Sequence, residues 1–391
     1  MFETFPAAEE LGLSCRIGGL QGGAVPDLAS RRTDYWMTPF QLPGWRLAWN
    51  HALGTPRDVL PVTAILTRKQ RTLAVLPLAI QETATMRVLT WHAADQSDYG
   101  APIIARDQLA SFCGLDGGSL LSRIAHMAGG ADLVYLPRQP AAIAGLANPL
   151  VLRGSIAHHA GAHAINFMPG ESWEAFYVRR RSAATRQQLR KKQRNLAKLG
   201  TVGFRVAGTA DEARAITEHC LAAKSRQLAR LGHHDPFAPP DVRRFLVDYF
   251  GDAAGNEGWA VALTLDGRMI ASSVGFAQPG EWLLYQMAME EGRAGNCSPG
   301  TQLLMHIMQH CIASGATCLD LAMGDESYKF DWCDRHQGLF NSSLPLTAKG
   351  RLADAAVRLK AHALRRMAAH PRIYDAGKAL KRQLHALNIR L

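Results

Sequence analysis

The sequence predicts an α/β (α+β) fold built from two copies of one unit. Apolar runs with strand character alternate with segments of helical periodicity along the chain, which is typical of mixed α/β proteins. The hairpin expected at residues 59–81 recurs at 259–277, and the helix and strand expected at 119–136 recur at 302–321. The chain has 391 residues, which is enough for two ordinary domains. The repeated patterns therefore indicate two domains of the same kind.

The elements of the first half follow from hydrophobic periodicity and from the positions of Gly and Pro. Thr38-Pro39 begins a helix that runs through Trp45 and Trp49, and Gly129-Gly130 ends a second helix. In order, the expected elements are a short strand at 14–17, a helix at 38–54, strands at 59–67, 72–81 and 86–91, a helix at 119–128 and a strand at 131–136.

The second half is expected to open at Glu171 and to continue into a basic helix. Arg179 to Leu199 has a thin apolar stripe and ends at Gly200. Asp266-Gly267 favours a tight turn between two strands. The expected elements are a helix at 179–199, a strand at 202–206, helices at 211–231 and 239–250, and the hairpin at 259–277.

The stretch from Glu281 to Trp332 joins two buried strands through a helix. Its apolar runs and its Gly and Pro residues give the order strand, glycine-containing loop, helix, strand and polar loop. The elements are a strand at 282–289, a loop at 290–298, a helix from Pro299 to Gly315, a strand at 318–322 and a polar loop from Gly324.

The start of this helix is a candidate anion site. Ser298 can cap the helix, and Pro299 suits its first turn. The unpaired N–H groups at a helix N-terminus and the positive end of the helix dipole attract phosphate groups. A cap alone explains the same residues. The second polar loop favours a site, because ligands in open α/β sheets bind at the carboxyl ends of strands and both loops lie at such ends.

Motifs in both halves carry a resemblance to a known superfamily. The second half contains R-R-S-A-A-T-R-x-x-L-R-K-K-x-R-x-L, S-P-G-x-x-L-L and D-L-x-x-G-D-E-x-Y-K-x-x-W, and the first half contains Trp45, Trp49, TLAVLPLAIQ at 72–81 and DYGAP at 98–102. Together they resemble the CelD-like (cellulose and exopolysaccharide biosynthesis) branch of the GNAT acyltransferase superfamily, which is related to the FemABX aminoacyl transferases. The resemblance extends from about Phe40 to Pro345.

The resemblance implies tandem GNAT-like domains, each a mixed, mostly antiparallel sheet flanked by helices. We expect an N-terminal copy at 1–165, an acyltransferase copy at 166–345 and a basic helical extension at 346–391. The first copy is expected to be degenerate, because its strand at 131–136 is not followed by a G-D-E-x-Y-K loop. The chemistry is therefore expected in the second copy.

Acetyl-CoA or another acyl-CoA is the co-substrate that the resemblance implies. In GNAT-like proteins, the loop before the main helix binds the pyrophosphate and the preceding strand pairs with pantetheine. Carried over to this chain, the phosphate contacts are Arg293, Ser298, Gly300 and Thr301, and the pantetheine edge is Met287, Ala288 and Met289. Of the usual glycine signature, only Gly300 is clearly in place.

The polar loop supplies the candidate catalytic residues. Acyl transfer requires removal of a proton from the acceptor and stabilisation of negative charge on the carbonyl. Asp325 or Glu326 is the candidate base, Tyr328 the candidate proton donor to the departing thiolate, and Lys329 the candidate positive charge. A helix N-cap followed by a first-turn acid explains Asp325 and Glu326 equally well.

Three function classes stay open. The first is an acyl-CoA-dependent N- or O-acyltransferase acting on a small amine, a hydroxyl compound, a sugar or a polysaccharide precursor. The second is a FemABX-like aminoacyl-tRNA-dependent transferase, for which the basic run at 179–194 would bind tRNA. The helices at 211–231 and 239–250 are too short for the coiled-coil arm of some of those relatives. The third is a non-catalytic binding protein with the same fold.

Charge and cysteine usage bound the class of protein. The formal net charge is +11. Residues 179–194 contain eight Lys or Arg and no Asp or Glu, and residues 349–391 contain eleven Lys or Arg and two Asp. Such runs attract phosphate-rich ligands, nucleic acid or anionic surfaces, or form a solvated face. Seven cysteines without C-x-x-C spacing fit a reducing cytosol. We find no membrane-spanning run and no signal-like N-terminus, so we expect a cytoplasmic protein.

The histidines give no signal for a metal site. His158, His159 and His163 are expected in a linker-like loop, and His306 and His310 are expected to pack within a helix. Two other residues have structural interpretations: Trp332 is expected in the core, and Asp320 is a candidate buried acceptor for backbone N–H groups. The sequence leaves the oligomeric state open.

Overall fold

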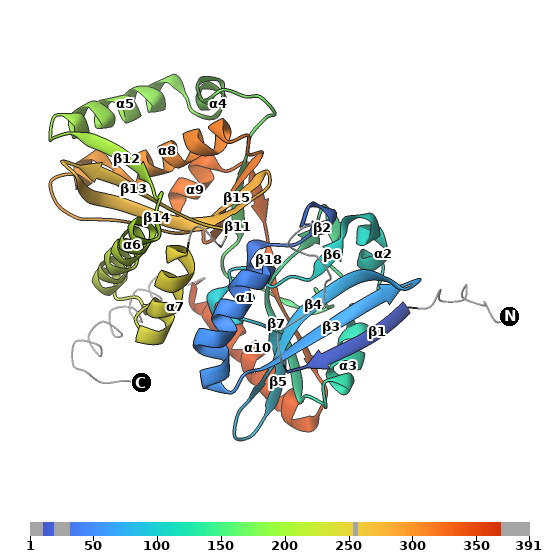
Figure 1. Cartoon of the computed structure of the whole chain (residues 1–391). Helices are drawn as coiled ribbons and strands as arrows, with labels where there is room; N and C mark the ends of the chain where they lie inside the picture. Colours follow the sequence, from blue (N-terminus) through green and yellow to red (C-terminus); the bar gives the residue numbers. More distant parts are fainter. Residues whose placement is uncertain (1–10, 19–31, 253–256, 369–391) are drawn as a thin grey trace.

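Two large β-sheets lie side by side in the computed structural model, which describes residues 11–18, 32–252 and 257–368 (Figure 1). Over these residues one sheet has nine strands and the other has seven, and helices pack on both. The predicted α/β fold is confirmed. No helix among the described residues is long and apolar enough to span a bilayer.

The first sheet has the strand order β1-β3-β4-β5-β7-β18-β10, with β6 beside β4 and β2 beside β6. The strands predicted at 59–67 and 72–81 form an antiparallel hairpin, and the one predicted at 86–91 follows them. The strands are β1 (Leu11–Ile17), β2 (Tyr35–Trp36), β3 (Leu60–Arg68), β4 (Arg71–Glu82), β5 (Arg87–Trp91), β6 (Ile103–Ala105), β7 (Leu133–Pro140), β10 (Ile156–Ala157) and β18 (Leu339–Pro345). A separate hairpin joins β8 (Ala142–Ile143) to β9 (Leu146–Ala147).

The second sheet has the order β12-β13-β14-β15-β16-β11-β17. Its central hairpin turns at Asp266 and Gly267, whose positive φ angles of 49° and 78° fit the tight turn predicted there. The strands are β11 (Ala162–Asn166), β12 (Val202–Val206), β13 (Gly258–Leu265), β14 (Arg268–Gln278), β15 (Glu281–Met289), β16 (Cys318–Met323) and β17 (Arg335–Gln337).

The two sheets repeat the same strand order. Strands β1, β3, β4, β5 and β7 occupy the places that β12, β13, β14, β15 and β16 occupy in the second sheet. In each sheet one parallel pair is joined by a helical crossover. Helices α2 (Leu109–Cys113) and α3 (Gly117–Met127) lie between β5 and β7, and α8 (Pro299–Ala313) lies between β15 and β16.

The two units exchange a strand. In the second sheet, the place beside β16 is taken by β11, which precedes that unit in the sequence. In the first sheet, the equivalent place beside β7 is taken by β18, from the end of the second unit. Residue 165, the predicted boundary, lies within β11, and β18 from the predicted second domain pairs in the first sheet. The division into domains at 165 and 345 stays a prediction.

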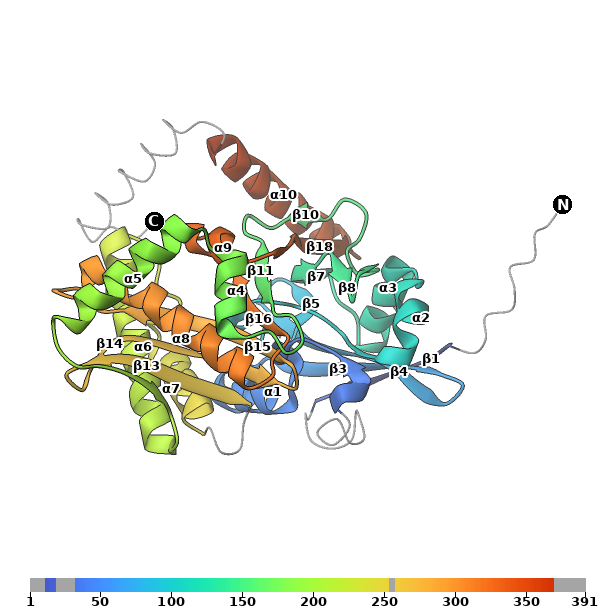
Figure 2. The same ribbon diagram turned by 90° about the horizontal axis from the view of Figure 1, so that it is seen from above.

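Helices cover both faces of the second sheet (Figures 1 and 2). Helices α6 (Ala210–Leu231) and α7 (Pro240–Gly251) lie on one face, and α8 lies on the other with α4 (Trp173–Arg180) and α5 (Ala183–Ala197) beyond it. The short helix α9 (Ser327–Trp332) follows β16, and α10 (Ala348–Ala368) packs on β18 and β7. The rest of the proposed C-terminal extension, 369–391, lies outside the described residues.

A cluster of aromatic rings joins the first half of the chain to the second sheet. Trp45, in α1 (Pro43–Trp49), is fully buried, and its ring centroid lies 4.8 Å from that of Phe245, 4.9 Å from Tyr249 and 5.2 Å from Phe276. Edge-to-face contacts of this kind stabilise a core beyond the area they bury. The two halves therefore share one core.

Two predicted helices have different bounds. The basic helix expected at 179–199 is broken at Arg181, because Ser182 accepts a hydrogen bond from Thr185 N and begins a new helix, α5. The helix expected at 38–54 is a series of short helical segments, of which α1 is the α-helical part. The others are 3₁₀ turns at Pro39–Gln41 and Thr55–Arg57 and a π-helical turn at Asn50–Gly54.

Candidate active site

Strands β15 and β16 diverge, and a cleft opens between them. They pair in parallel only from Glu281 to Leu283, opposite Cys318 to Asp320. Tyr285 forms a bulge in β15 at the point of divergence. Beyond it lies a cleft of about 1030 Å³, bounded by β15, the end of β16, the C-terminal part of α6 and a loop of the first half. This volume is enough for an extended small-molecule ligand.

Lys329 is a buried positive charge in this cleft. Its side chain is 3% exposed, and Nζ donates hydrogen bonds to the carbonyl oxygens of Met323 at 2.9 Å and Ala322 at 3.3 Å. Glu326 Oε2 lies 3.2 Å from Nζ. These contacts fix the ammonium at the carboxyl end of β16, where the sequence predicted it.

Glu326 and Tyr328 also line the cleft. Glu326 stands at the N-cap position of α9, but its side chain makes no capping hydrogen bond and pairs with Lys329 instead. Burial, with the nearby negative charge of Glu326, raises the pKa of Tyr328 above its usual value. Because a thiol has a pKa of about 8.5, proton transfer from Tyr328 to a departing thiolate is uphill. Tyr328 is therefore suited to donate a hydrogen bond and keep its proton.

Asp325 does not line the cleft, unlike the other three predicted catalytic residues. Its Oδ1 accepts hydrogen bonds from His163 Nε2 at 2.8 Å and from Gly161 N at 3.0 Å. Burial raises its pKa, but these hydrogen bonds, together with the charges of His163 and Lys329, leave the pKa below its usual value. The expectation that His163 lies in a loop is wrong, because β11 places it in the second sheet with 3% of its side chain exposed.

Asp98 is a cleft residue to which the sequence assigned no role. Burial raises its pKa to about 6, against the opposing influence of Arg138, Lys329 and a hydrogen bond from the Met323 backbone. A carboxylate that ionises near neutral pH is suited to accept a proton from a reacting group. The DYGAP motif was the only sequence signal for this position.

Asp320 connects the two halves behind the cleft. Its Oδ1 accepts hydrogen bonds from Tyr99 Oη at 2.8 Å and from Ala322 N at 2.7 Å. Burial raises its pKa, and the two hydrogen bonds oppose that shift. The prediction of an acceptor for backbone N–H groups is confirmed at Asp320, which is half-buried, and that of a core role is confirmed at Trp332, which is 1% exposed.

The predicted pantetheine edge is only partly in the cleft. Met287 lines it, whereas the Ala288 side chain is buried against Cys220 and Ala223. Met289 lines a neighbouring pocket between β15 and α6. Beyond Leu283, the edge of β15 that faces away from β14 pairs with no described strand. That open edge can pair with an extended ligand that carries amides.

The N-terminus of α8 has an unexpected neighbour. Ser298 does not cap the helix through its side chain; its φ of 52° is left-handed, and Lys192 Nζ donates a hydrogen bond to its Oγ at 2.7 Å. A cation beside a helix N-terminus is unfavourable unless an anion joins it. Gly300 is buried, with Met289 Sδ 3.3 Å from where a Cβ would be, and Thr301 is partly exposed.

Arg293 is directed away from this helix. Its Nη2 lies 3.3 Å from Asp266 Oδ2, at the exposed turn between β13 and β14. The structure thus pairs Arg293 with Asp266, and its role as a phosphate contact stays a prediction. Lys192, from the distant basic run, contacts Ser298 at the start of α8.

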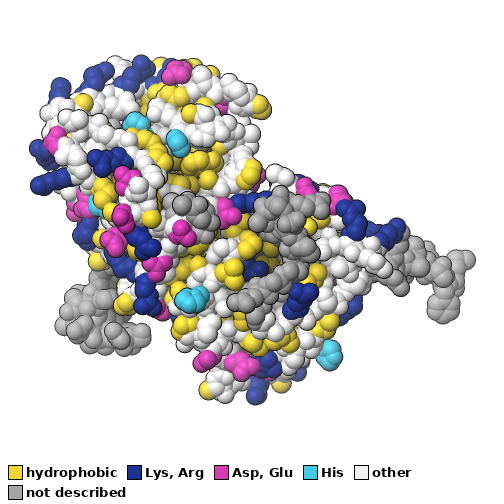
Figure 3. All heavy atoms as spheres, viewed as in Figure 1, with side chains coloured by type: hydrophobic (Ala, Val, Ile, Leu, Met, Phe, Trp, Pro, Cys, Tyr) yellow, Lys and Arg dark blue, Asp and Glu magenta, His cyan; other side chains and the backbone are white. Residues whose placement is uncertain are grey.

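Several residues of the basic run make internal contacts. Arg180 and Arg181 donate hydrogen bonds to the backbone carbonyls of Trp332 and Asp331, and the Arg181 guanidinium stacks on the Trp332 ring. Lys and Arg side chains nevertheless remain along the outer face of α5, at the top of the view in Figure 3. The run is thus partly structural and partly a solvated basic face.

The two histidines of α8, His306 and His310, pack against aromatic rings. His306 stacks on Phe204, and His310 packs edge-on against Trp282, as the packing interpretation predicted. Within 11–18, 32–252 and 257–368, no group of three or more His, Cys, Asp or Glu is placed to hold a metal ion.

Comparison with known proteins places this geometry among GNAT-like folds. Residues 183–330 match the family model of the acetyltransferase (GNAT) domain. The structure of FemX overlaps with a TM-score of 0.54 at 9% identity, over 83% of this chain and 97% of that chain. A tandem GNAT protein from the clavulanic acid biosynthesis pathway overlaps with a TM-score of 0.44 at 11% identity, over 85% of this chain and 98% of that chain.

The structure of L-PGS from Bacillus licheniformis overlaps with a TM-score of 0.45 at 13% identity, over 75% of this chain and 86% of that chain. No curated protein sequence matches the chain significantly. At 9% identity the FemX overlap shows a shared fold alone. Residues 183–330 match a GNAT-type acetyltransferase domain, and the diverging strands β15 and β16 lie within that range.

Proposed function

We propose that the protein is an acyltransferase that moves an acyl group, acetyl in the simplest case, from acyl-CoA to an amine or hydroxyl group. The observation that carries the proposal is the cleft between β15 and β16, which runs along an open strand edge to Lys329 and Asp98. A GNAT-type domain without such a divergence would have no place for a thioester between its strands.

The donor is proposed to lie along β15. The amides of its pantetheine arm pair with the open edge near Met287, and its phosphates lie near the N-terminus of α8. Lys192 and the Thr301 hydroxyl supply the polar contacts there. A bound phosphate would offset the unfavourable placement of the Lys192 ammonium beside the positive helix end.

The reaction centre is proposed at the inner end of the cleft. Asp98 takes the proton of the acceptor, because its pKa of about 6 is closer to neutrality than that of an ordinary carboxyl group. Lys329 stabilises negative charge that develops on the carbonyl oxygen, and Tyr328 donates a hydrogen bond to the leaving sulfur. Glu326 holds the Lys329 ammonium in position.

The acceptor class is the finer part of the proposal. The CelD-like resemblance favours a sugar or a polysaccharide precursor over other amines and hydroxyl compounds. An aminoacyl-tRNA donor is less favoured, because Arg180 and Arg181 of the basic run are engaged in contacts within the chain.

The test is a donor competition with the purified protein. Release of free CoA from acetyl-CoA is measured with D-glucosamine, alone and with uncharged tRNA as competitor. We expect glucosamine-dependent release that tRNA leaves unchanged. Release that tRNA suppresses at low salt but not at high salt would instead favour a tRNA-binding donor site. No release with any amine or sugar would contradict the proposal.

A further inference from the structure

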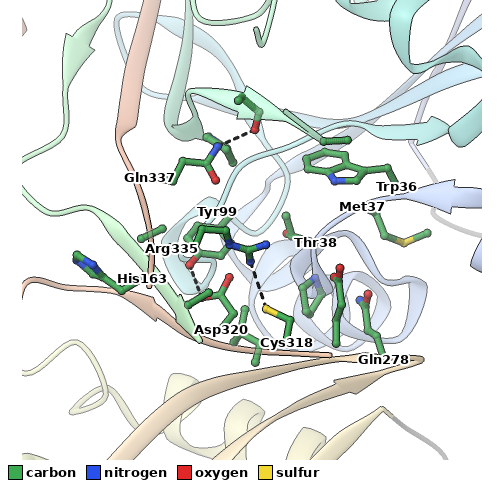
Figure 4. Close-up of a pocket in the computed structure, with 18 of the residues that line it drawn as sticks. Trp36, Met37, Thr38, Tyr99, His163, Gln278, Cys318, Asp320, Arg335 and Gln337 are labelled. Carbon is green, nitrogen blue, oxygen red and sulfur yellow. Dashed lines mark hydrogen bonds between the residues drawn. The ribbon is translucent and has the colours of Figure 1, made fainter. Parts of the chain in front are cut away.

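A second cavity, of about 470 Å³, lies between the second sheet and the first half of the chain (Figure 4). It shares no lining residue with the cleft between β15 and β16, but residues that are neighbours in the sequence line the cavity and the cleft. Asp98 and Leu321 line the cleft, whereas Tyr99 and Asp320 line the cavity. The hydrogen bond from Tyr99 to Asp320 therefore lies in a wall one residue thick between the two spaces.

The cavity is lined by both hydrogen-bond donors and acceptors. The hydrogen bonds from Tyr99 and Ala322 to Asp320 both use Oδ1, which leaves Oδ2 without a hydrogen bond to the described residues. Gln278 Nε2 is buried and also has no partner among those residues. The Arg335 side chain extends into the same space, and the Trp36 ring lies across from it (Figure 4).

A pair of histidines, His163 and His336, adds a hydrogen-bond acceptor to the cavity, because their contacts fix the tautomer of each ring. His163 Nε2 lies 2.8 Å from Asp325 Oδ1 and must carry a proton to donate to that carboxylate. In a neutral His163 ring, Nδ1 then has a lone pair, so His336 Nδ1, 2.7 Å away, must be the donor. In a neutral His336 ring this leaves a lone pair on Nε2, and the His336 side chain lines the cavity.

We propose that this cavity is the acceptor site and that it binds a sugar ring of monosaccharide size. An aromatic ring beside alternating donors and acceptors suits a molecule with an apolar ring face and several hydroxyl groups. His336 Nε2 accepts a hydrogen bond from one hydroxyl, and Asp325 and His163 are positioning residues that hold the required tautomer. Arg335, Gln278 and Asp320 bind the others. The inference rests on the proposed acyltransferase function.

The two sites would cooperate only when the Tyr99–Asp320 hydrogen bond opens. The reactive amine or hydroxyl of an acceptor anchored in the cavity then passes from the Tyr99 side into the cleft, next to Asp98. When that group attacks the acyl carbon, its proton passes to Asp98, the carbon–sulfur bond breaks, and the electron pair leaves with the CoA thiolate. Asp98 later returns the proton to the thiolate or to water.

The test uses protein labelled with ¹⁵N at histidine and long-range proton–nitrogen spectra of the rings. The free protein is expected to show His163 protonated at Nε2 and His336 at Nδ1. D-glucosamine should shift the His336 signals in a saturable way, whereas cyclohexylamine, a ring with an amine and no hydroxyls, should not. Arg335→Gln should weaken glucosamine binding about tenfold or more, and His126→Gln, at an exposed position of α3, should leave it unchanged.

The opposite tautomers, no saturable shift with glucosamine, or an equal shift with cyclohexylamine would each overturn the inference. Acetyl-CoA is titrated separately into the same samples. Sugar binding without acetyl-CoA binding would retain the cavity as a sugar site while the proposed donor fails. Acetyl-CoA binding without sugar binding would retain the donor and overturn the acceptor site.

Discussion

Tyr99 Oη donates a hydrogen bond to Asp320 Oδ1 at 2.8 Å and so ties the first half of the chain to the strand that ends in the candidate active site. Tyr99 is buried and Asp320 is half-buried, and the bond lies between the cleft and the cavity. A half-buried carboxylate that loses one of its donors bears an uncompensated desolvation penalty. The stability of this junction should therefore depend on one hydroxyl group.

Tyr99→Phe is expected to lower the free energy of unfolding by about 1–3 kcal/mol, because it removes a donor from a half-buried carboxylate without changing the ring. The measurement is urea denaturation followed by far-UV circular dichroism. Tyr135→Phe is the matched control, since Tyr135 is a partly buried tyrosine of β7 whose hydroxyl has no hydrogen bond to the described residues. Equal stability of the two variants would contradict the importance of the bond.

Lys329→Met is expected to reduce acyl transfer about 100-fold or more, because it removes the fixed positive charge from the end of β16. Acetyl-CoA binding should be affected much less than kcat. Thiol release measured at saturating acetyl-CoA checks this. Lys198→Met, at the exposed end of α5, controls for the loss of any one lysine. Unchanged kcat in Lys329→Met would remove this residue from the proposed chemistry.

The raised pKa of Asp98 gives a signed pH dependence. Its pKa of about 6 lies well above that of an ordinary aspartate, so the folded state binds the extra proton. Asp98 therefore destabilises the fold as pH rises through that window, and the destabilisation is complete above pH 6. Asp98→Asn should gain about 2 kcal/mol of stability relative to wild type between pH 4.5 and pH 7.

Urea denaturation at the two pH values checks this expectation, with the exposed neighbour Asp95→Asn as control. The catalytic part has its own readout. Wild-type kcat/KM should rise with pH and level off above about pH 6, and the Asp98→Asn variant should be slow and flat over that range. A gain in stability that is the same at both pH values would mean that Asp98 titrates normally.

Local patterns predicted most elements well. The strand at 202–206 has the predicted bounds, and the turn at Asp266-Gly267 is where its residue types place it. The break at Arg181 also has a local signal, because Ser182 and Thr185 have the spacing of a helix cap. What local patterns could not show is the exchange of β11 and β18, since pairing between distant strands leaves no periodicity in either segment.

The residues of the candidate site also differ in whether local sequence could predict their proximity. Glu326, Tyr328 and Lys329 come from one motif, so their proximity was predictable from the sequence. Asp98 and Lys192 reach the site from segments more than a hundred residues away, and only the fold brings them there. Arg293 had the right residue type for a phosphate contact but lies at the hairpin turn with Asp266.

Binding of acetyl-CoA, measured by calorimetry, tests the proposed function most directly. We predict micromolar binding to the wild-type protein, weakened about tenfold or more in Lys192→Glu, because a carboxylate at the positive end of α8 would repel the donor's phosphates. Lys191→Glu, the exposed neighbour in α5, should bind within about threefold of wild type. No binding to the wild-type protein, or equal binding to both variants, would contradict the proposed acyl-CoA site.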